Sequence, residues 1–163
     1  MINPAEDIVS IWIQEVKNHF IMSNIVVPKS RGGRGKEIDL LSTKDKKYFW
    51  IEVSVSPNPR LPSKSERFNK LTKNALDKFA DEKSTYLNKR FPGKLFQKWF
   101  VYSPKLFGRK SDERDRYCNA LKQRGIYPIG FDDVLHELLE KLNYMGYDAT
   151  RNYLFLLRKF WDK

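Results

Sequence analysis

The sequence has few of the residues on which many metal sites and secreted domains depend. Cys118 is its one cysteine, and His19 and His136 are its two histidines. A single cysteine excludes an internal disulfide and agrees with a reducing compartment. The two histidines lie far apart, without cysteines or acids at zinc-ligand spacing, so the sequence predicts neither a zinc site nor a Ser/His/Asp triad.

Long apolar runs are also missing. No segment approaches the roughly 20 apolar residues of a transmembrane helix. Glu6 and Asp7 interrupt the short apolar stretch near the N-terminus, and no cleavage site follows, so the pattern is not that of a signal peptide. A length of 163 residues suits one domain that buries its own core. We therefore expect a single cytoplasmic domain over residues 1–163, with a core over about 4–103 and a C-terminal extension over about 104–163.

Positive charge is abundant. The chain carries 31 Lys and Arg against 20 Asp and Glu, a formal net charge of +11. Such an excess favours a polyanionic partner, nucleic acid before an anionic membrane surface. The distribution is uneven, since residues 29–36 are basic and residues 131–148 are mainly acidic. The candidates for phosphate contacts are Arg31, Arg34, Lys36, Arg60, Lys64, Arg67 and Lys70.

Periodicity and turn residues predict an α/β fold. Asn3 and Pro4 suit the start of a helix, and Asp132 suits the cap of a later one. Helices are expected over 4–19, 63–88, 112–124, 132–142 and 148–161, and strands over 24–28, 36–41, 48–56, 95–103 and 126–131. Short turns join the first three strands, whereas the later strands follow helices and should run parallel to a neighbour. The order predicts a three-layer α/β sandwich around a central mixed sheet.

Two acids lie within apolar strand segments. Burying an ionised carboxylate there is unfavourable unless a cation or a hydrogen-bond donor is paired with it. Asp39 lies on the expected strand 36–41 and Glu52 on the strand 48–56, so pairing of these strands brings them together. Two alternatives follow. The carboxylates hold Mg²⁺ or Mn²⁺, with the Val53 carbonyl as a further ligand, or each forms an ion pair with one of the abundant lysines.

This region resembles the restriction-endonuclease-like superfamily, whose PD-(D/E)xK motif places an Asp on one strand and Glu-x-Lys on the next. The matching segments are GRGKEIDLL, ending at Leu41, and IEVS, ending at Ser54, with twelve residues between Asp39 and Glu52. These segments look like the core of archaeal Holliday-junction resolvases and of related small bacterial nuclease-like proteins. The resemblance implies a restriction-endonuclease-like fold, metal-dependent cleavage of DNA, a homodimer, and a third acid on the first helix, for which Glu6 is preferred to Glu15.

Ser54 stands where this motif has its lysine. A serine hydroxyl can hold a water molecule but cannot supply positive charge to the transition state. Either a lysine from elsewhere reaches the site, with Lys73 as a candidate, or the domain binds without cutting. Lys73 and its neighbours on the helix can equally form a solvated surface that contacts phosphate.

The leading hypothesis is a metal-dependent nuclease that hydrolyses DNA phosphodiester bonds. Its expected catalytic residues are Glu6, Asp39, Glu52 and Ser54, with Mg²⁺ or Mn²⁺ bound by Asp39, Glu52 and Val53. The alternative is a catalytically inactive nucleic-acid-binding module on the same fold. A third hypothesis is a protein-interaction domain that uses the acidic segment 131–148.

Overall fold

A computed structural model describes residues 3–28, 35–55, 64–107 and 111–142, together with Thr150 and Leu154. Its helices are α1 (Pro4–Glu15), α2 (Lys64–Lys78), α3 (Asp81–Arg90), the 3₁₀ turn η1 (Pro104–Phe107), α4 (Ser111–Lys122) and α5 (Phe131–Lys141). Its strands are β1 (Phe20–Val27), β2 (Lys36–Lys44), β3 (Lys47–Ser54), β4 (Phe96–Tyr102) and β5 (Ile126–Gly130).

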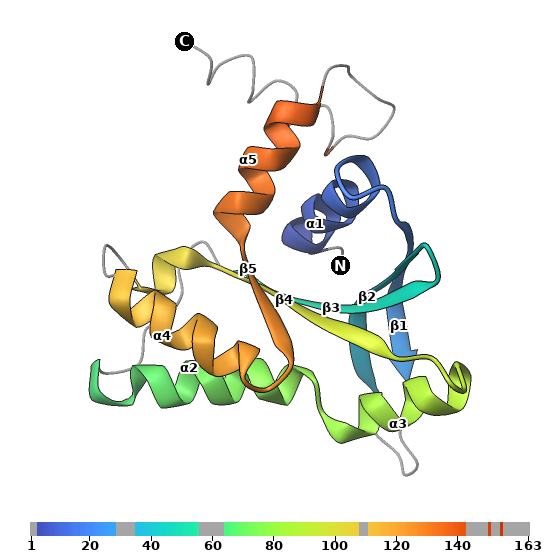
Figure 1. Cartoon of the computed structure of the whole chain (residues 1–163), viewed down its shortest axis with the longest axis horizontal. Coiled ribbons are helices and arrows are strands. Elements are labelled where there is room, and N and C mark those ends of the chain that lie inside the picture. The colour runs from blue at the N-terminus through green and yellow to red at the C-terminus, as the bar shows by residue number, and fades with distance from the viewer. Residues whose placement is uncertain are drawn as a thin grey trace.

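The five strands form one mixed sheet in the order β1-β2-β3-β4-β5. The first three are antiparallel neighbours, whereas β3, β4 and β5 run parallel because helices connect them. Helices α1 and α5 cover one face, and α2, α3 and α4 cover the other (Figure 1). The expected α/β class, with a mixed sheet and helices on both sides, is therefore confirmed.

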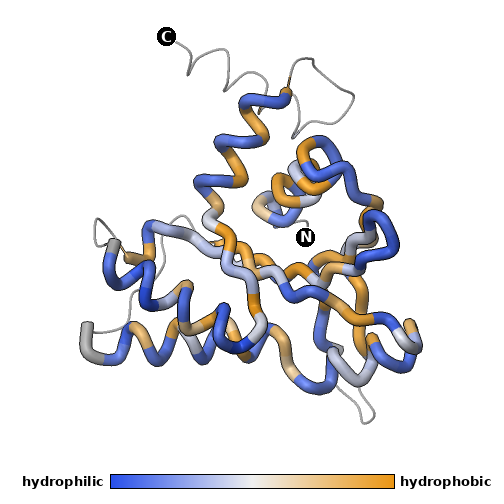
Figure 2. The backbone as a smooth tube through the Cα atoms, viewed as in Figure 1, coloured by the Kyte–Doolittle hydropathy of each residue, from blue (hydrophilic) through white to orange (hydrophobic). Residues whose placement is uncertain are grey.

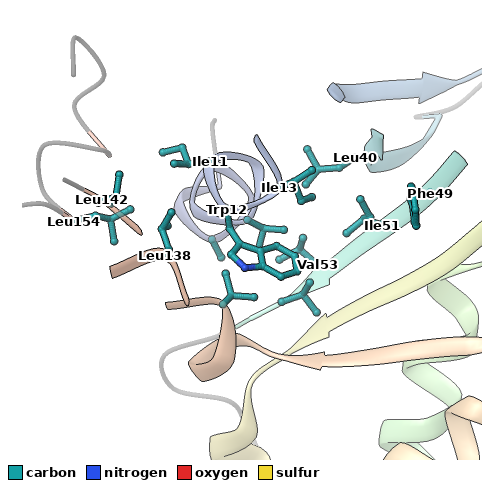
Figure 3. Close-up of a cluster of buried hydrophobic side chains, with 14 residues drawn as sticks. Ile11, Trp12, Ile13, Leu40, Phe49, Ile51, Val53, Leu138, Leu142 and Leu154 are labelled. Atoms are coloured by element: carbon teal, nitrogen blue, oxygen red, sulfur yellow. The ribbon is translucent and has the colours of Figure 1, made fainter. Parts of the chain in front are cut away.

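Each face of the sheet has its own hydrophobic core, and in Figure 2 the orange strand residues lie between the helical layers. Trp12 and Ile13 of α1 pack on Ile51 and Val53 in the first core (Figure 3). The second core contains Trp50 and Phe79, whose ring centroids lie 4.9 Å apart with the edge of one ring towards the other. Alternate residues of β3 thus serve opposite cores, as strand geometry requires.

Several element boundaries differ from those expected. Helix α1 ends at Glu15 rather than at residue 19, and the next segment turns through Asn18, which has a positive φ of 56°. Strand β1 then begins at Phe20, earlier than the expected residue 24. Residue 132 was expected to cap α5, but Gly130 occupies the N-cap position and Asp132 lies in the first turn. The expected helix over 148–161 falls mainly outside the described residues.

The largest difference is a break in the helix expected over 63–88. Helix α2 ends at Lys78, and α3 begins at Asp81 after Ala80, whose ψ of 150° is not helical. No glycine or proline marks this break. Phe79 is buried against Trp50 and Phe100 there, so tertiary packing decides where the helix ends.

Candidate active site

Asp39 lies where the regular pairing of β2 is interrupted. The β1–β2 ladder skips Asn24 and Asp39, and Asn24 has a positive φ of 55°. On the other side, the β2–β3 ladder extends only as far as the pair Leu40↔Ile51. Beyond it, Asp39 Oδ2 accepts a hydrogen bond of 2.7 Å from the backbone N–H of Val53. The carboxylate thus takes the place of a backbone acceptor and is anchored to β3.

The interruption also breaks the expected alternation of side chains along β2. Leu40 belongs to the core beneath α1, whereas Ile38 and Leu41 both belong to the core beneath α2 and α3. Residues 38 and 40 would share a face in a regular strand. Ile38 is therefore the residue that departs from regular alternation, whereas Glu37 and Asp39 lie beside Lys78 and Leu41 packs in the core beneath α2 and α3.

Glu52 is fully buried, with 0% of its side chain exposed. Its Oε1 accepts two hydrogen bonds, one of 2.6 Å from Trp50 Nε1 and one of 2.7 Å from Lys83 Nζ. Its Oε2 is buried without any hydrogen-bond partner among the described residues. Burial, and secondly the negative charge of Asp39, raises the pKa of Glu52 to about 7, although Lys83 and Trp50 oppose this.

Lys78, at the end of α2, points its ammonium at three oxygen atoms. Its Nζ lies 3.3 Å from Asp39 Oδ2, 3.4 Å from the Val53 carbonyl oxygen and 3.9 Å from Glu52 Oε2. These residues are the three that the sequence nominated as metal ligands. The structure therefore defines one position for a cation, and Lys78 supplies positive charge to it.

The donor set suits a hard divalent ion. Carboxylate and carbonyl oxygens are the ligands that Mg²⁺ takes in proteins, together with water. Glu52 Oε2 has its lone pairs free of hydrogen bonds and is directed towards the cation position, so it fits the role of a ligand. Within the described ranges, no group of three or more His, Cys, Asp or Glu side chains gathers as a metal site. The candidate site has two carboxylates and a backbone carbonyl.

An open pocket of about 360 Å³ adjoins this cation position. It is lined by Lys36, Glu37, Asn74, Asp77, Lys78 and Lys83. Lys36, one of the residues expected to contact phosphate, forms a 3.2 Å ion pair with Glu82 of α3 at this side of the molecule. The pocket is open to solvent and reaches Lys78, and its lining carries three lysines and two acids.

Glu6 belongs to the first turn of α1, as expected for an acid near the helix start. Its carboxylate accepts a hydrogen bond of 2.6 Å from Asn3 Nδ2. Partial burial raises its pKa, the bond from Asn3 opposes this, and repulsion by Asp39 adds to it. Glu6 therefore shares the electrostatic environment of Asp39, and its role as a third acid stays a prediction.

The other expected residues are dispersed. Ser54 is exposed at the end of β3, and Lys70 is exposed on α2. Arg67 approaches Glu113 at 3.9 Å. Arg31, Arg34 and Arg60, and the side chain of Lys64, lie outside the described part of the chain.

Lys73, the candidate to replace the missing motif lysine, is also exposed. The lysine that lies beside Asp39 is instead Lys78. Sequence analysis missed both Lys78 and Lys83. The break between α2 and α3 turns both lysines towards Glu52, and the sequence carries no marker of that break. One sequence feature could have indicated these two lysines. Phe79 is apolar and stands four residues after Ala75, so it should be buried, and Lys78 and Lys83 lie before and after it.

A larger pocket of about 680 Å³ lies on the opposite face of the sheet. Trp12, Trp99 and Tyr127 are among its lining residues, and Glu137 lies at its margin. The carboxylate of Glu137 already accepts hydrogen bonds from Trp12 at 2.8 Å and from Lys17 at 2.7 Å. Size therefore favours this pocket, but the unpartnered carboxylate oxygen and the converging ligands favour the site at Asp39 and Glu52.

No family model matches the chain. No curated protein matches it either. Among solved structures, it is similar to a crystal structure of a protein of unknown function, AF1548, with 18% sequence identity and a TM-score of 0.48. The match covers 80% of this chain and 59% of that chain, so this chain spans less than two thirds of its length. In the part of the chain that the structure describes, no helix is long and apolar enough to cross a membrane.

Proposed function

We propose that this protein is a metal-dependent nuclease that hydrolyses phosphodiester bonds in nucleic acid, DNA in the first instance. The observation that carries the proposal is the convergence of Asp39, Glu52 and the Val53 carbonyl on one cation position. One of these oxygens, Glu52 Oε2, is buried without a hydrogen-bond partner. A buried polar atom without a partner is uncommon and calls for an explanation, such as an ion that binds there.

In this proposal the residues have two roles, metal binding and contact with phosphate. Asp39, Glu52 and the Val53 carbonyl would hold Mg²⁺ or Mn²⁺, which activates water and offsets charge on the phosphate. The net charge of +11 attracts the nucleic-acid backbone. Lys36, which lines the pocket, would exchange its ion pair with Glu82 for a phosphate contact. The element order and this site together support a restriction-endonuclease-like fold, which we propose as the finer description of the α/β sandwich.

The test is an assay with supercoiled, linear, single-stranded and branched DNA, with Mg²⁺ or Mn²⁺. The wild-type protein is expected to cleave at least one substrate, and Asp39→Asn is expected to lower the rate at least 100-fold, because the anchored carboxylate is lost. Asp115→Asn is the matched control, since Asp115 is exposed on α4, away from the site. Equal rates for Asp39→Asn and wild type would contradict the proposal.

The second candidate is a nucleic-acid-binding module without turnover. Two observations favour it: Ser54 replaces the motif lysine, and the ammonium of Lys78 already lies 3.3 Å from Asp39. This function predicts binding whose affinity falls steeply with salt, because basic residues displace counterions from the backbone. It also predicts no cleavage with any divalent metal. The same DNA panel, with affinity measured at two salt concentrations, separates the two functions.

A further inference from the structure

The site contains two lysines in different environments. Lys83 is 5% exposed and makes one close contact, 2.7 Å to Glu52 Oε1. Lys78 is 36% exposed and lies 3.3–3.9 Å from its three oxygens. Lys83 is therefore a fixed counter-ion of Glu52, whereas Lys78 is held more loosely and has solvent beside it.

The charges at the site explain why this difference matters. The two carboxylates, Asp39 and Glu52, and the two ammonium groups, Lys78 and Lys83, sum to zero formal charge. A divalent ion at the same oxygens would leave an excess of +2, with the ammonium of Lys78 nearby. Like charges within about 4 Å repel each other far more strongly inside a protein than in bulk water, because the effective dielectric constant is lower. An ion bound to these oxygens would therefore disfavour the present position of the Lys78 ammonium.

The pocket beside the site gives this ammonium somewhere to go. Its lining carries three ammonium groups, of Lys36, Lys78 and Lys83, against the two carboxylates of Glu37 and Asp77. A side chain with four methylene groups can swing its ammonium by several ångströms without moving the helix. An ammonium directed into this pocket would meet a phosphate that approaches the metal ligands. Ser54, which is neutral and exposed, has no such positive charge to offer.

We propose that Lys78 competes with the divalent ion for the oxygens of Asp39, Glu52 and Val53, and that the displaced ammonium supplies the positive charge missing at Ser54. The metal-free site is thereby kept neutral, and ion binding turns Lys78 towards the substrate phosphate. The second half of this inference rests on the proposed nuclease function. The first half, competition for the ligands, does not.

The experiment is a calorimetric titration with Mn²⁺, without nucleic acid. Lys78→Met is expected to bind Mn²⁺ at least tenfold more tightly than the wild type, because the competing charge is gone. Lys78→Arg keeps the charge and is expected to show no such gain. Lys73→Met is the matched control on the exposed face of the same helix and is expected to equal the wild type. Asp39→Asn should abolish binding, which places the ion at this site.

Cleavage is then measured with the same proteins. Lys78→Met is expected to lose at least 100-fold in rate while it gains metal affinity, a combination that a purely structural role would not produce. Equal or weaker Mn²⁺ binding by Lys78→Met overturns the competition, and so does a gain in Lys78→Arg. A wild-type rate for Lys78→Met overturns the catalytic part. If the wild type cleaves no substrate, the proposed function fails, and the Mn²⁺ titration still decides the competition.

Discussion

Replacing Lys83 by methionine is expected to lower the free energy of unfolding by about 3–5 kcal/mol at pH 8. Lys83 and Glu52 are both buried, at 5% and 0% exposure, and their charged atoms lie 2.7 Å apart. Methionine has a similar volume, so the cost comes from the charge left on Glu52 rather than from a cavity. The measurement is urea unfolding, with Lys89→Met, exposed on the same helix α3, as the control.

A second variant tests whether the pair itself is responsible. Glu52→Gln combined with Lys83→Met removes both charges and keeps an oxygen that can accept the hydrogen bond from Trp50. Its stability is expected to return to within about 1 kcal/mol of the wild type, because apolar or neutral replacements of buried ion pairs are well tolerated. A loss below 1 kcal/mol for Lys83→Met alone would show that Glu52 is not buried as described.

The architecture followed from signals that are local in the sequence. Asn3 caps α1 through a 3.1 Å hydrogen bond to the backbone N–H of Ala5, and Pro4 occupies the first turn, as expected. Strand β3 alternates between two cores because its residues 49–53 are apolar apart from Glu52. Short turns and helical connections then fixed which neighbours are antiparallel and which are parallel.

The geometry around Asp39 and Glu52 depends on residues that are distant in the sequence, so sequence analysis could not predict it. The irregular pairing of β2 at Asp39 depends on Asn24, a residue of the neighbouring strand that adopts a positive φ. The positions of Lys78 and Lys83 depend on the burial of Phe79 between them. Sequence analysis offered a metal site or a lysine ion pair as alternatives for the two acids. The structure shows the ion pairs, and the oxygens that form them are the ones from which we propose a metal site.

Ser54 takes on a different meaning in this setting. In the sequence it argued against catalysis, because the motif position carries no charge. In the structure, Lys78 brings an ammonium to within 3.4 Å of the Val53 carbonyl, one residue before Ser54. A positive charge is thus present at the site, but it is supplied by Lys78 of α2 and not by residue 54 of β3. The serine therefore argues against the usual arrangement of the motif more than against a nuclease.

The stability of the metal-free protein is expected to fall between about pH 4.5 and pH 7 because of Glu52. Its pKa is about 7 in the folded protein, against an ordinary value of 4.5. In this interval the folded state holds a proton that the unfolded chain has released, so rising pH favours unfolding. A difference of this size corresponds to about 3 kcal/mol. Above pH 7 both states are ionised, and this contribution levels off.

Glu52→Gln/Lys83→Met is the reference, since it lacks the titrating carboxylate and its counter-ion. Urea unfolding of both proteins in EDTA at pH 5, 6, 7 and 8 should show the wild type losing about 3 kcal/mol relative to the reference. His19 titrates with the opposite sign, because burial lowers its pKa, but it does so in both proteins. A constant difference across the series would contradict the raised pKa. Mn²⁺ should stabilise the wild type more at pH 8 than at pH 5, because only the ionised carboxylate binds a cation.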